Sequence, residues 1–330
     1  MQYLLARPSR LADRFHRWAI RRWFPVLARV APRWPRWWEQ VGARIVIFLV
    51  MVVYPRPKRL IRKNLSRVLG APQGSWRVRR ATSAMLRHFA FYWADLFRFA
   101  QLPASAAQAI FDDDGSVGAL TEAMAAGKGV ILLTGHLGNW ELGGVVLGRE
   151  QLPLSVVYVK DKFEGAENYR SFLRQQGDIE EIAIEPNASW SSLPVLRALR
   201  AGRVVAMQGD RDFDDRGIAA PFFGERVRFP RGPFLVALLT GAPIIPSFIT
   251  YTPSYRLVGR FGEPIHVVPT GDRERDLDTA IQRWAAILED EVRRHPTQWY
   301  TFYDYFAQHA AHEDEEEPAA PAAVPQRASA

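Results

Sequence analysis

The chain contains no cysteine among its 330 residues. That absence excludes disulfide bonds, thiolate metal sites and a cysteine nucleophile, and it fits a reducing compartment. A Gly-x-Ser-x-Gly segment, which carries the serine nucleophile of many hydrolases, is also missing. Any covalent intermediate on this protein would have to form on Ser, Asp, Glu, His or Lys.

Acidic side chains are nearly absent from residues 1–70, which hold sixteen Lys and Arg against two Asp and Glu, a net charge of +14. The whole chain carries only +8, so the remainder sums to −6, and five of those negative charges lie in the run Glu313–Glu317. The basic charge therefore belongs to the N-terminal region and not to the whole protein. The acidic, then Ala/Pro-rich tail, residues 311–330, is predicted to be disordered.

The basic region is also rich in tryptophan, with Trp18 and Trp23 followed by three more before residue 39. Four arginines between residues 10 and 21 share one face of a helical wheel. A basic amphipathic helix with tryptophans is typical of segments that bind an anionic membrane surface. A solvated face on an ordinary helix is the alternative. Nucleic-acid binding is a further option, but no recognised module for it is present, so no nucleic-acid partner is predicted.

No apolar run in this region is long enough to span a bilayer. Ile45–Tyr54 holds ten apolar residues, about 15 Å of helix or half of a hydrocarbon core. The run starts too late for a cleavable signal peptide, and no small-residue cleavage site follows it. We expect residues 1–70 to form membrane-associating helices on the cytoplasmic face of the inner membrane, without crossing it; a buried core helix is the alternative reading of the apolar run.

Helix and strand patterns alternate from about residue 116 onwards. This alternation predicts an α/β domain over residues 71–310, with a central, mostly parallel sheet flanked by helices. Short apolar runs predict strands at Val130–Thr134, Leu154–Val159, Ile182–Glu185, Val204–Gln208, Ile244–Ile249 and Arg256–Gly259. The expected helices span residues 75–100, 138–149, 166–176, 190–201, 231–240 and 274–294.

The most informative stretch, TGHLGNWE at residues 134–141, joins the first of these strands to a helix. Its His136 and Glu141 are five residues apart, and on one continuous helix they would point about 140° away from each other. Gly135 and Gly138 allow the chain to turn so that the two can meet. A neutral imidazole oriented by a carboxylate is a general base poised near neutral pH. A capping histidine beside a solvated glutamate is the alternative.

Charged residues at the ends of other elements are candidates for substrate binding. Asp210, Arg211 and Asp212 follow a buried strand, at the edge where α/β proteins bind ligands. Two aspartates could bind a metal, but no third ligand is spaced nearby, so no metal site is predicted. Arg231 precedes a helix start, a favourable place for an anion. A solvated, salt-bridged loop is the alternative for the aspartates.

Two further arginines, Arg170 and Arg174, lie one helical turn apart and could grip a phosphate together, unless they form a solvated helix face. We add Asn139 of the histidine stretch to the expected substrate-binding set. Phe222–Gly224 is interpreted as a loop whose two phenylalanines wall an apolar pocket. Read alone, His295–Tyr303 predicts a proline-started aromatic helix that packs on the core.

Taken together, these segments resemble the bacterial lysophospholipid acyltransferase superfamily, and within it the lipid A lauroyl/myristoyl acyltransferase branch. The mycobacterial phosphatidylinositol mannoside acyltransferases share the same set. The resemblance covers roughly residues 35–306 and is carried by the following segments: His136–Glu141 after its strand, Gly209–Asp212, Phe222–Gly224, Gly241–Pro243 with Pro246, His295–Pro296 with Gln298–Tyr300, and Arg62–Leu65.

The resemblance implies an acyl transfer without a covalent acyl-enzyme. His136 would take the proton of an acceptor hydroxyl, which attacks a thioester on acyl carrier protein or coenzyme A. Glu141 would fix the imidazole, and backbone amides near Gly135, or Arg174, would hold the oxyanion. No cofactor is implied beyond the acyl-ACP or acyl-CoA co-substrate, and the partner is a membrane lipid acceptor, such as a lipid A precursor. A hydrolase that activates water, or a catalytically silent membrane adaptor, are the competing functions.

Overall fold

The computed structural model describes residues 26, 41–42, 55–99, 111–149, 152–160, 164–184 and 192–310. The predictions for the N-terminal amphipathic helix, the apolar run at residues 45–54 and the acidic tail fall outside these residues. Within them, no helix combines the length and the apolar character that crossing a membrane requires.

A seven-stranded sheet forms the centre of the protein, with strand order β1-β9-β8-β2-β5-β3-β4. Only the pair β8 and β9 is antiparallel, so the prediction of a mostly parallel α/β sheet is confirmed. Its strands are β1 (Phe111–Asp113), β2 (Val130–Thr134), β3 (Leu154–Val159), β4 (Glu180–Ile184), β5 (Val204–Gln208), β8 (Ile244–Tyr251) and β9 (Leu257–Phe261). A separate hairpin pairs β6 (Ile218–Phe222) with β7 (Glu225–Phe229).

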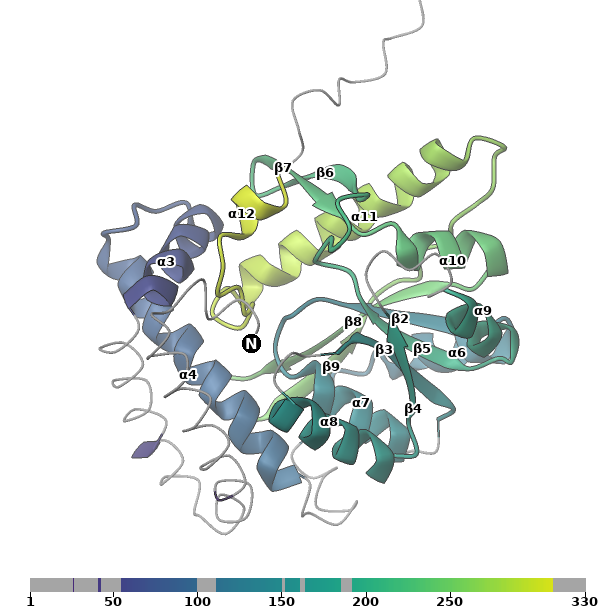
Figure 1. Cartoon of the computed structure of the whole chain (residues 1–330), viewed down its shortest axis with the longest axis horizontal. Helices are drawn as coiled ribbons and strands as arrows, with labels where there is room; N and C mark the ends of the chain where they lie inside the picture. Colours follow the sequence, from purple (N-terminus) through teal and green to yellow (C-terminus); the bar gives the residue numbers. More distant parts are fainter. Residues whose placement is uncertain are drawn as a thin grey trace, which may run out of the picture.

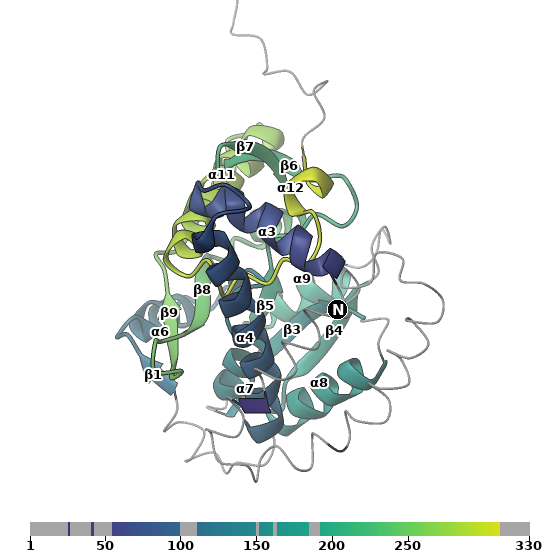
Figure 2. The ribbon, with the colours of Figure 1, turned by 90° about the vertical axis from the view of Figure 1, so that its left-hand side faces the viewer.

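Helices cover both faces of the sheet (Figures 1 and 2). Along β2, Ile131 and Leu133 pack into the core cluster of the face covered by α9, α10 and α11, whereas Val130 and Leu132 pack into the cluster of the other face. That alternation is the period of two expected for a strand buried on both sides. The helices are α3 (Pro55–Leu69), α4 (Trp76–Phe99), α6 (Val117–Ala125), α7 (Trp140–Arg149), α8 (Glu164–Gln176), α9 (Leu193–Arg200), α10 (Gly232–Thr240), α11 (Arg273–Arg294) and α12 (Tyr305–Gln308).

The α3 helix, which the sequence analysis grouped with the membrane-associating region, packs into the domain. Its Ile61 and Leu65 are buried. The amide of Asn64 donates to the carbonyls of Thr301 and Tyr303, 3.2 and 2.6 Å away. These bonds fasten α3 to the segment that follows α11, and that segment reaches the site described below.

Two expectations were wrong in ways that bear on the site. Residues 222–224 are not a loop that walls a pocket: they close the β6–β7 hairpin through Phe223 and Gly224, both with positive φ, and Phe222 is fully buried. The segment His295–Tyr303, which was expected to be a helix, forms none. It is extended at Trp299, where a β-bridge to Leu137 replaces helical hydrogen bonds.

Candidate active site

Two neighbouring parallel strands deliver the central residues of the site. In the register of β2 and β5, Thr134 pairs with Gln208, so the two strands end side by side. A glycine follows each strand, and the next residue is His136 on one strand and Asp210 on the other. Because the two strands end at the same level of the sheet, the histidine and the aspartate occupy equivalent positions and meet.

The contact between His136 and Asp210 has two parts. The imidazole Nδ1 lies 2.7 Å from Oδ1 of the carboxylate, and the backbone N–H of His136 donates to Oδ2 at 3.0 Å. Asp210 is fully buried, whereas His136 is partly exposed and lines a cavity. The carboxylate therefore lies behind the imidazole, and Nε2 is the ring nitrogen left for a substrate.

The electrostatics of this pair favour a neutral histidine on an ionised aspartate. Burial, followed by the charge of Arg211, lowers the pKa of His136 to about 4, although Asp210 opposes the change. Burial alone would raise the pKa of Asp210, but the charge and hydrogen bonds of His136, together with Arg211, hold it below its ordinary value. Because an ionised carboxylate only accepts hydrogen bonds, Nδ1 must carry the proton and Nε2 the lone pair. This is the state of a general base.

A single glycine allows the turn between His136 and the following helix. Gly138 has φ +67°, a conformation that residues with a Cβ rarely adopt, and a Cβ here would lie 1.8 Å from the carbonyl oxygen of Ile249. The next N–H, from Asn139, donates to that same oxygen at 2.8 Å. The turn is thereby fixed against the end of β8.

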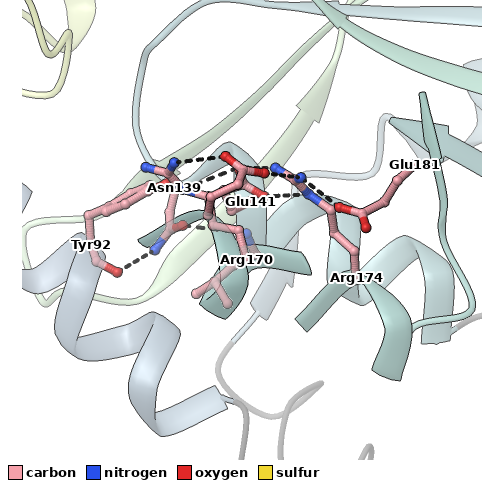
Figure 3. A network of polar contacts seen from close by, with 8 residues as sticks. Tyr92, Asn139, Glu141, Arg170, Arg174 and Glu181 are labelled. Atoms are coloured by element: carbon pink, nitrogen blue, oxygen red, sulfur yellow. Dashed lines mark hydrogen bonds and ion pairs between the residues drawn. The ribbon is translucent and has the colours of Figure 1, made fainter. Parts of the chain in front are cut away.

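The expectation that Glu141 orients His136 was wrong, because the carboxylate on Nδ1 is that of Asp210. Glu141 instead faces α8, where Arg174 donates to both of its oxygens, at 3.3 and 2.8 Å, and Arg170 lies 3.6 Å away (Figure 3). Burial would raise the pKa of Glu141, but the two arginines lower it. Arg174 also binds Glu181 at 2.9 Å, so carboxylates surround a guanidinium that is 3% exposed.

A cavity open to solvent lies in front of His136 and holds about 1020 Å³ of empty space. Of the residues predicted from the sequence, it brings together His136, Glu141, Arg170, Arg174 and Arg211. The rest of the wall is largely aromatic and comes from α4, α7, β3, the loop after β5 and the segment after α11. These aromatic residues are Phe89, Tyr92, Trp93, Trp140, Tyr158, Phe213, Tyr300, Phe302 and Tyr303.

A second cavity lies between α7 and the sheet, and its wall is mostly apolar. It shares Trp140, Glu141, Tyr158, Arg174 and Gln208 with the first cavity, so the two are neighbours separated by the Glu141–Arg174 ion pair. The remaining wall includes Leu132, Leu147, Leu154, Val156, Ile179, Ala206 and Ile249, with two glycines of α7.

Four residues expected to bind substrate do not line either cavity. Asn139 is fully buried, and its amide donates to the Tyr251 hydroxyl at 2.9 Å, so it fastens α7 to β8. Asp210 supports His136 from behind. Asp212 is buried and accepts the backbone N–H of Gly217 at 2.8 Å, which closes its own loop. Arg231 binds Glu274 at the start of α11.

Arg231 also lies far along the molecule from the site. Leu288 of α11 lies next to the site, since its Cδ1 would be 3.0 Å from a Cβ placed on Gly135. Glu274, the partner of Arg231, precedes Leu288 by fourteen residues on the same helix. At 1.5 Å per residue, that separation is about 21 Å along α11. The anion site expected at the start of α10 is therefore not part of the cavity at His136.

The aromatic wall was missed by the sequence analysis. Phe89 to Trp93 lie in the helix expected at residues 75–100, and Tyr300 to Tyr303 in the helix expected at His295–Tyr303, and neither was expected to line a cavity. A signal was present, since both segments concentrate aromatic residues, yet only the tertiary structure brings them together. Ring centroids of Phe89 and Phe302 lie 4.7 Å apart, and those of Tyr92 and Trp140 lie 5.0 Å apart.

The fold and the site define an α/β protein with a neutral histidine at the wall of an open cavity and an apolar cavity beside it. Residues 18–307 match the family of bacterial lipid A biosynthesis acyltransferases. The chain belongs to this family and is an acyltransferase. It is 29% identical over 244 residues to a phosphatidylinositol mannoside acyltransferase of Mycobacterium tuberculosis, covering 73% of this chain and 74% of that protein. A protein of the same name from Mycolicibacterium smegmatis is 28% identical over 252 residues, with 73% and 76% covered.

Proposed function

We propose that this acyltransferase moves a fatty acyl chain from a thioester to a hydroxyl of a membrane glycolipid, with His136 as the general base. The observation that supports this proposal most is the neutral imidazole of His136, held by the buried, ionised Asp210 at the wall of an open cavity. A base of this kind suits the activation of a hydroxyl that is itself a poor nucleophile.

The reaction needs one proton to move twice. The acceptor hydroxyl gives its proton to Nε2 of His136 while its oxygen attacks the thioester carbonyl. The C–O bond forms, the C–S bond breaks, and the thiolate leaves with the proton from the imidazolium. Asp210 stabilises that imidazolium, because its carboxylate is 2.7 Å from Nδ1 and buried with it. The protein itself forms no covalent bond.

The apolar cavity under α7 is suited to the acyl chain of the donor. Its wall offers the hydrocarbon surface that a fatty chain needs, and it begins beside the residues that it shares with the cavity at His136. The phosphates that donors such as acyl-ACP and acyl-CoA carry would meet Lys160, Arg170 and Arg211 in the open cavity. Arg174, in contrast, has its guanidinium occupied by carboxylates, which argues against the oxyanion role expected of it.

A phosphatidylinositol mannoside is our first candidate acceptor. The two relatives are named phosphatidylinositol mannoside acyltransferases, and the match covers about three quarters of the length of each. A lipid A precursor is the second, on the strength of the family. The aromatic wall of the open cavity supports a sugar headgroup in either case, since aromatic rings offer the apolar faces on which sugar rings pack.

The test is product analysis by mass spectrometry with the purified full-length protein. Acyl-ACP and acyl-CoA of the same chain length are each combined with a phosphatidylinositol mannoside, a lipid A precursor or no acceptor. We expect an ester on one glycolipid and free thiol in equal amount, and neither product in His136→Ala. Free fatty acid without an ester would indicate a hydrolase, and no thioester consumption by the wild type would support the silent adaptor.

We also infer that residues 1–54 hold the protein on the cytoplasmic face of the inner membrane. The argument is the charge of +14 over residues 1–70, the tryptophans and the ten-residue apolar run. Deleting residues 1–54 should move the protein to the soluble fraction, whereas high salt should release the full-length protein only in part. Complete release by salt would contradict apolar insertion.

A further inference from the structure

The segment Gln298–Tyr300 is paired with the turn that carries His136. The Gly138 N–H donates to the carbonyl of Gln298, and the Tyr300 N–H donates to the carbonyl of His136, each at 2.9 Å. The side-chain amide of Gln298 accepts from the N–H of Tyr251 and donates to its carbonyl, both at 2.8 Å. The backbone of the residue between them, Trp299, is therefore fixed on both sides.

The indole of Trp299 reaches the same carboxylate as the histidine. Its Nε1–H donates to Oδ2 of Asp210 at 3.2 Å, and the side chain is fully buried. The carboxylate thus accepts three N–H groups: the His136 backbone and Trp299 on Oδ2, and His136 Nδ1 on Oδ1. The ring of Trp299 is in turn packed against those of Phe222 and Tyr305, with centroids 5.6 and 4.6 Å away.

We propose that Trp299 is a positioning residue for the acyl transfer, whose indole N–H prevents rotation of the Asp210 carboxylate and so keeps Oδ1 on the imidazole of His136. The inference rests on the proposed function of His136. A carboxylate turns easily about its terminal torsion, so its hydrogen bonds determine the angle at which one oxygen meets Nδ1. Two donors on the other oxygen fix that angle.

Another tryptophan of the chain shows what a purely structural indole does here. Trp284 is also fully buried next to the site, but its Nε1–H donates to the backbone carbonyl of Gly209 at 2.8 Å. Its N–H satisfies a backbone carbonyl and not an ionisable side chain. Trp299 differs because its N–H donates to the carboxylate that contacts His136.

Other charged or titratable groups act on the same pair. Arg211 lies with its Nε 4.0 Å from Oδ2 of Asp210, and the Tyr305 hydroxyl donates to the Asp210 carbonyl at 2.7 Å. Glu141 and His309 interact with the pair through space. Replacing Trp299 leaves these groups in place, so a change in the titration of His136 reports the loss of the indole donor.

The experiment removes only the donor. Benzothienylalanine, which has the shape of tryptophan with sulfur in place of N–H, is introduced at position 299, and Trp299→Phe is the simpler second variant. We expect kcat to fall about tenfold while KM for both substrates stays within twofold. The pKa of His136 should rise, because a carboxylate with fewer donors attracts the imidazolium more strongly, and the acid limb of the pH profile should move to higher pH.

Two controls separate positioning from stability. Trp284→Phe should lower the melting temperature without moving the pH profile. The His136 imidazole is also titrated by NMR in each variant, its signal assigned by its loss in His136→Ala, which needs no substrate. A wild-type pH profile and a wild-type His136 titration in both Trp299 variants would overturn the proposal. If no variant or wild-type protein transfers acyl groups, the proposed function fails, while the titration still decides the role of Trp299.

Discussion

Replacing Asp210 with asparagine tests the assignment of the base and its partner most directly. The substitution keeps the size of the side chain and removes its charge. Asp210 is fully buried behind His136, so the substrates should not meet the altered group. An amide can present either its oxygen or its NH₂ group to Nδ1. When the NH₂ group faces Nδ1, the imidazole must carry its proton on Nε2, and the lone pair that accepts the hydroxyl proton is lost.

The expected loss follows from two contributions. The wrong tautomer removes the base from a fraction of the molecules, and the neutral amide no longer stabilises the imidazolium 2.7 Å away. In histidine–aspartate pairs of other enzymes, the same substitution lowers kcat about 10⁴-fold. We expect about 10³–10⁴-fold for Asp210→Asn. KM should change less than threefold, because no atom of Asp210 lines the cavity.

Asp212→Asn is the matched control, since the two aspartates are neighbours in sequence and both are buried. Asp212 accepts the Gly217 N–H and does not contact His136. Its substitution should leave kcat within a few-fold of the wild type. Initial rates of thiol release and ester formation are measured for both variants, with circular dichroism as a check on folding. A folded Asp210→Asn protein with kcat within tenfold of the wild type would refute the pairing of His136 with Asp210.

Three further predictions concern the pH dependence and the two cavities. Burial lowers the pKa of His136 to about 4, and only the neutral form accepts a proton, so kcat/KM should stay level from pH 8 to about 5 and fall below that; an acid limb near the ordinary value of 6.5 would contradict a buried base. Glu141→Gln leaves Arg174 with Glu181 but without the carboxylate that accepts two of its hydrogen bonds, and should lower the free energy of unfolding by about 1–3 kcal/mol in urea titration, with KM affected more than kcat. Gly144→Leu should shift the preferred donor to shorter acyl chains in competition assays, because Gly144 lines the apolar cavity and a Cβ there has no neighbour closer than 3.9 Å. The control Gly143→Ala should lower stability instead, because its Cβ would lie 2.4 Å from Ile249. An unchanged chain preference in Gly144→Leu would argue against the acyl pocket.

The sequence was sufficient to predict the bounds of the central strands, whose side chains are largely buried on both faces of the sheet. β2, β3 and β5 begin and end at the predicted residues, because apolar residues fill most of their positions and a glycine or loop follows each of them. The hairpin of β6 and β7 was missed because Pro221 interrupts the apolar run of β6 and charged residues occupy β7. Its turn places Phe223 at positive φ, and a phenylalanine in the sequence does not indicate a turn of this kind.

The local sequence pattern marks Asp210 as a candidate partner of His136, but it does not show that the two residues meet. Both β2 and β5 are five residues long, and each is followed by a glycine and then by a chemically active residue. What the local pattern lacks is the strand order, in which β5 lies next to β2 although β3 and β4 intervene in the sequence. Seventy-four residues separate His136 from Asp210, so only the crossover connections bring them together.

Glu141 illustrates why proximity in sequence misleads here. It lies in the first turn of α7, which packs against α8, and two cations one helical turn apart on α8 point towards it. The two arginines are charged whereas His136 is neutral, so Glu141 pairs with the cations of α8 and not with the histidine that is closer in sequence. Glu141 thereby shapes the wall between the two cavities, while Asp210 sets the charge on the base. Substitution of Glu141 should therefore act mainly on KM and stability, and substitution of Asp210 mainly on kcat, which separates the two carboxylates in one set of kinetic measurements.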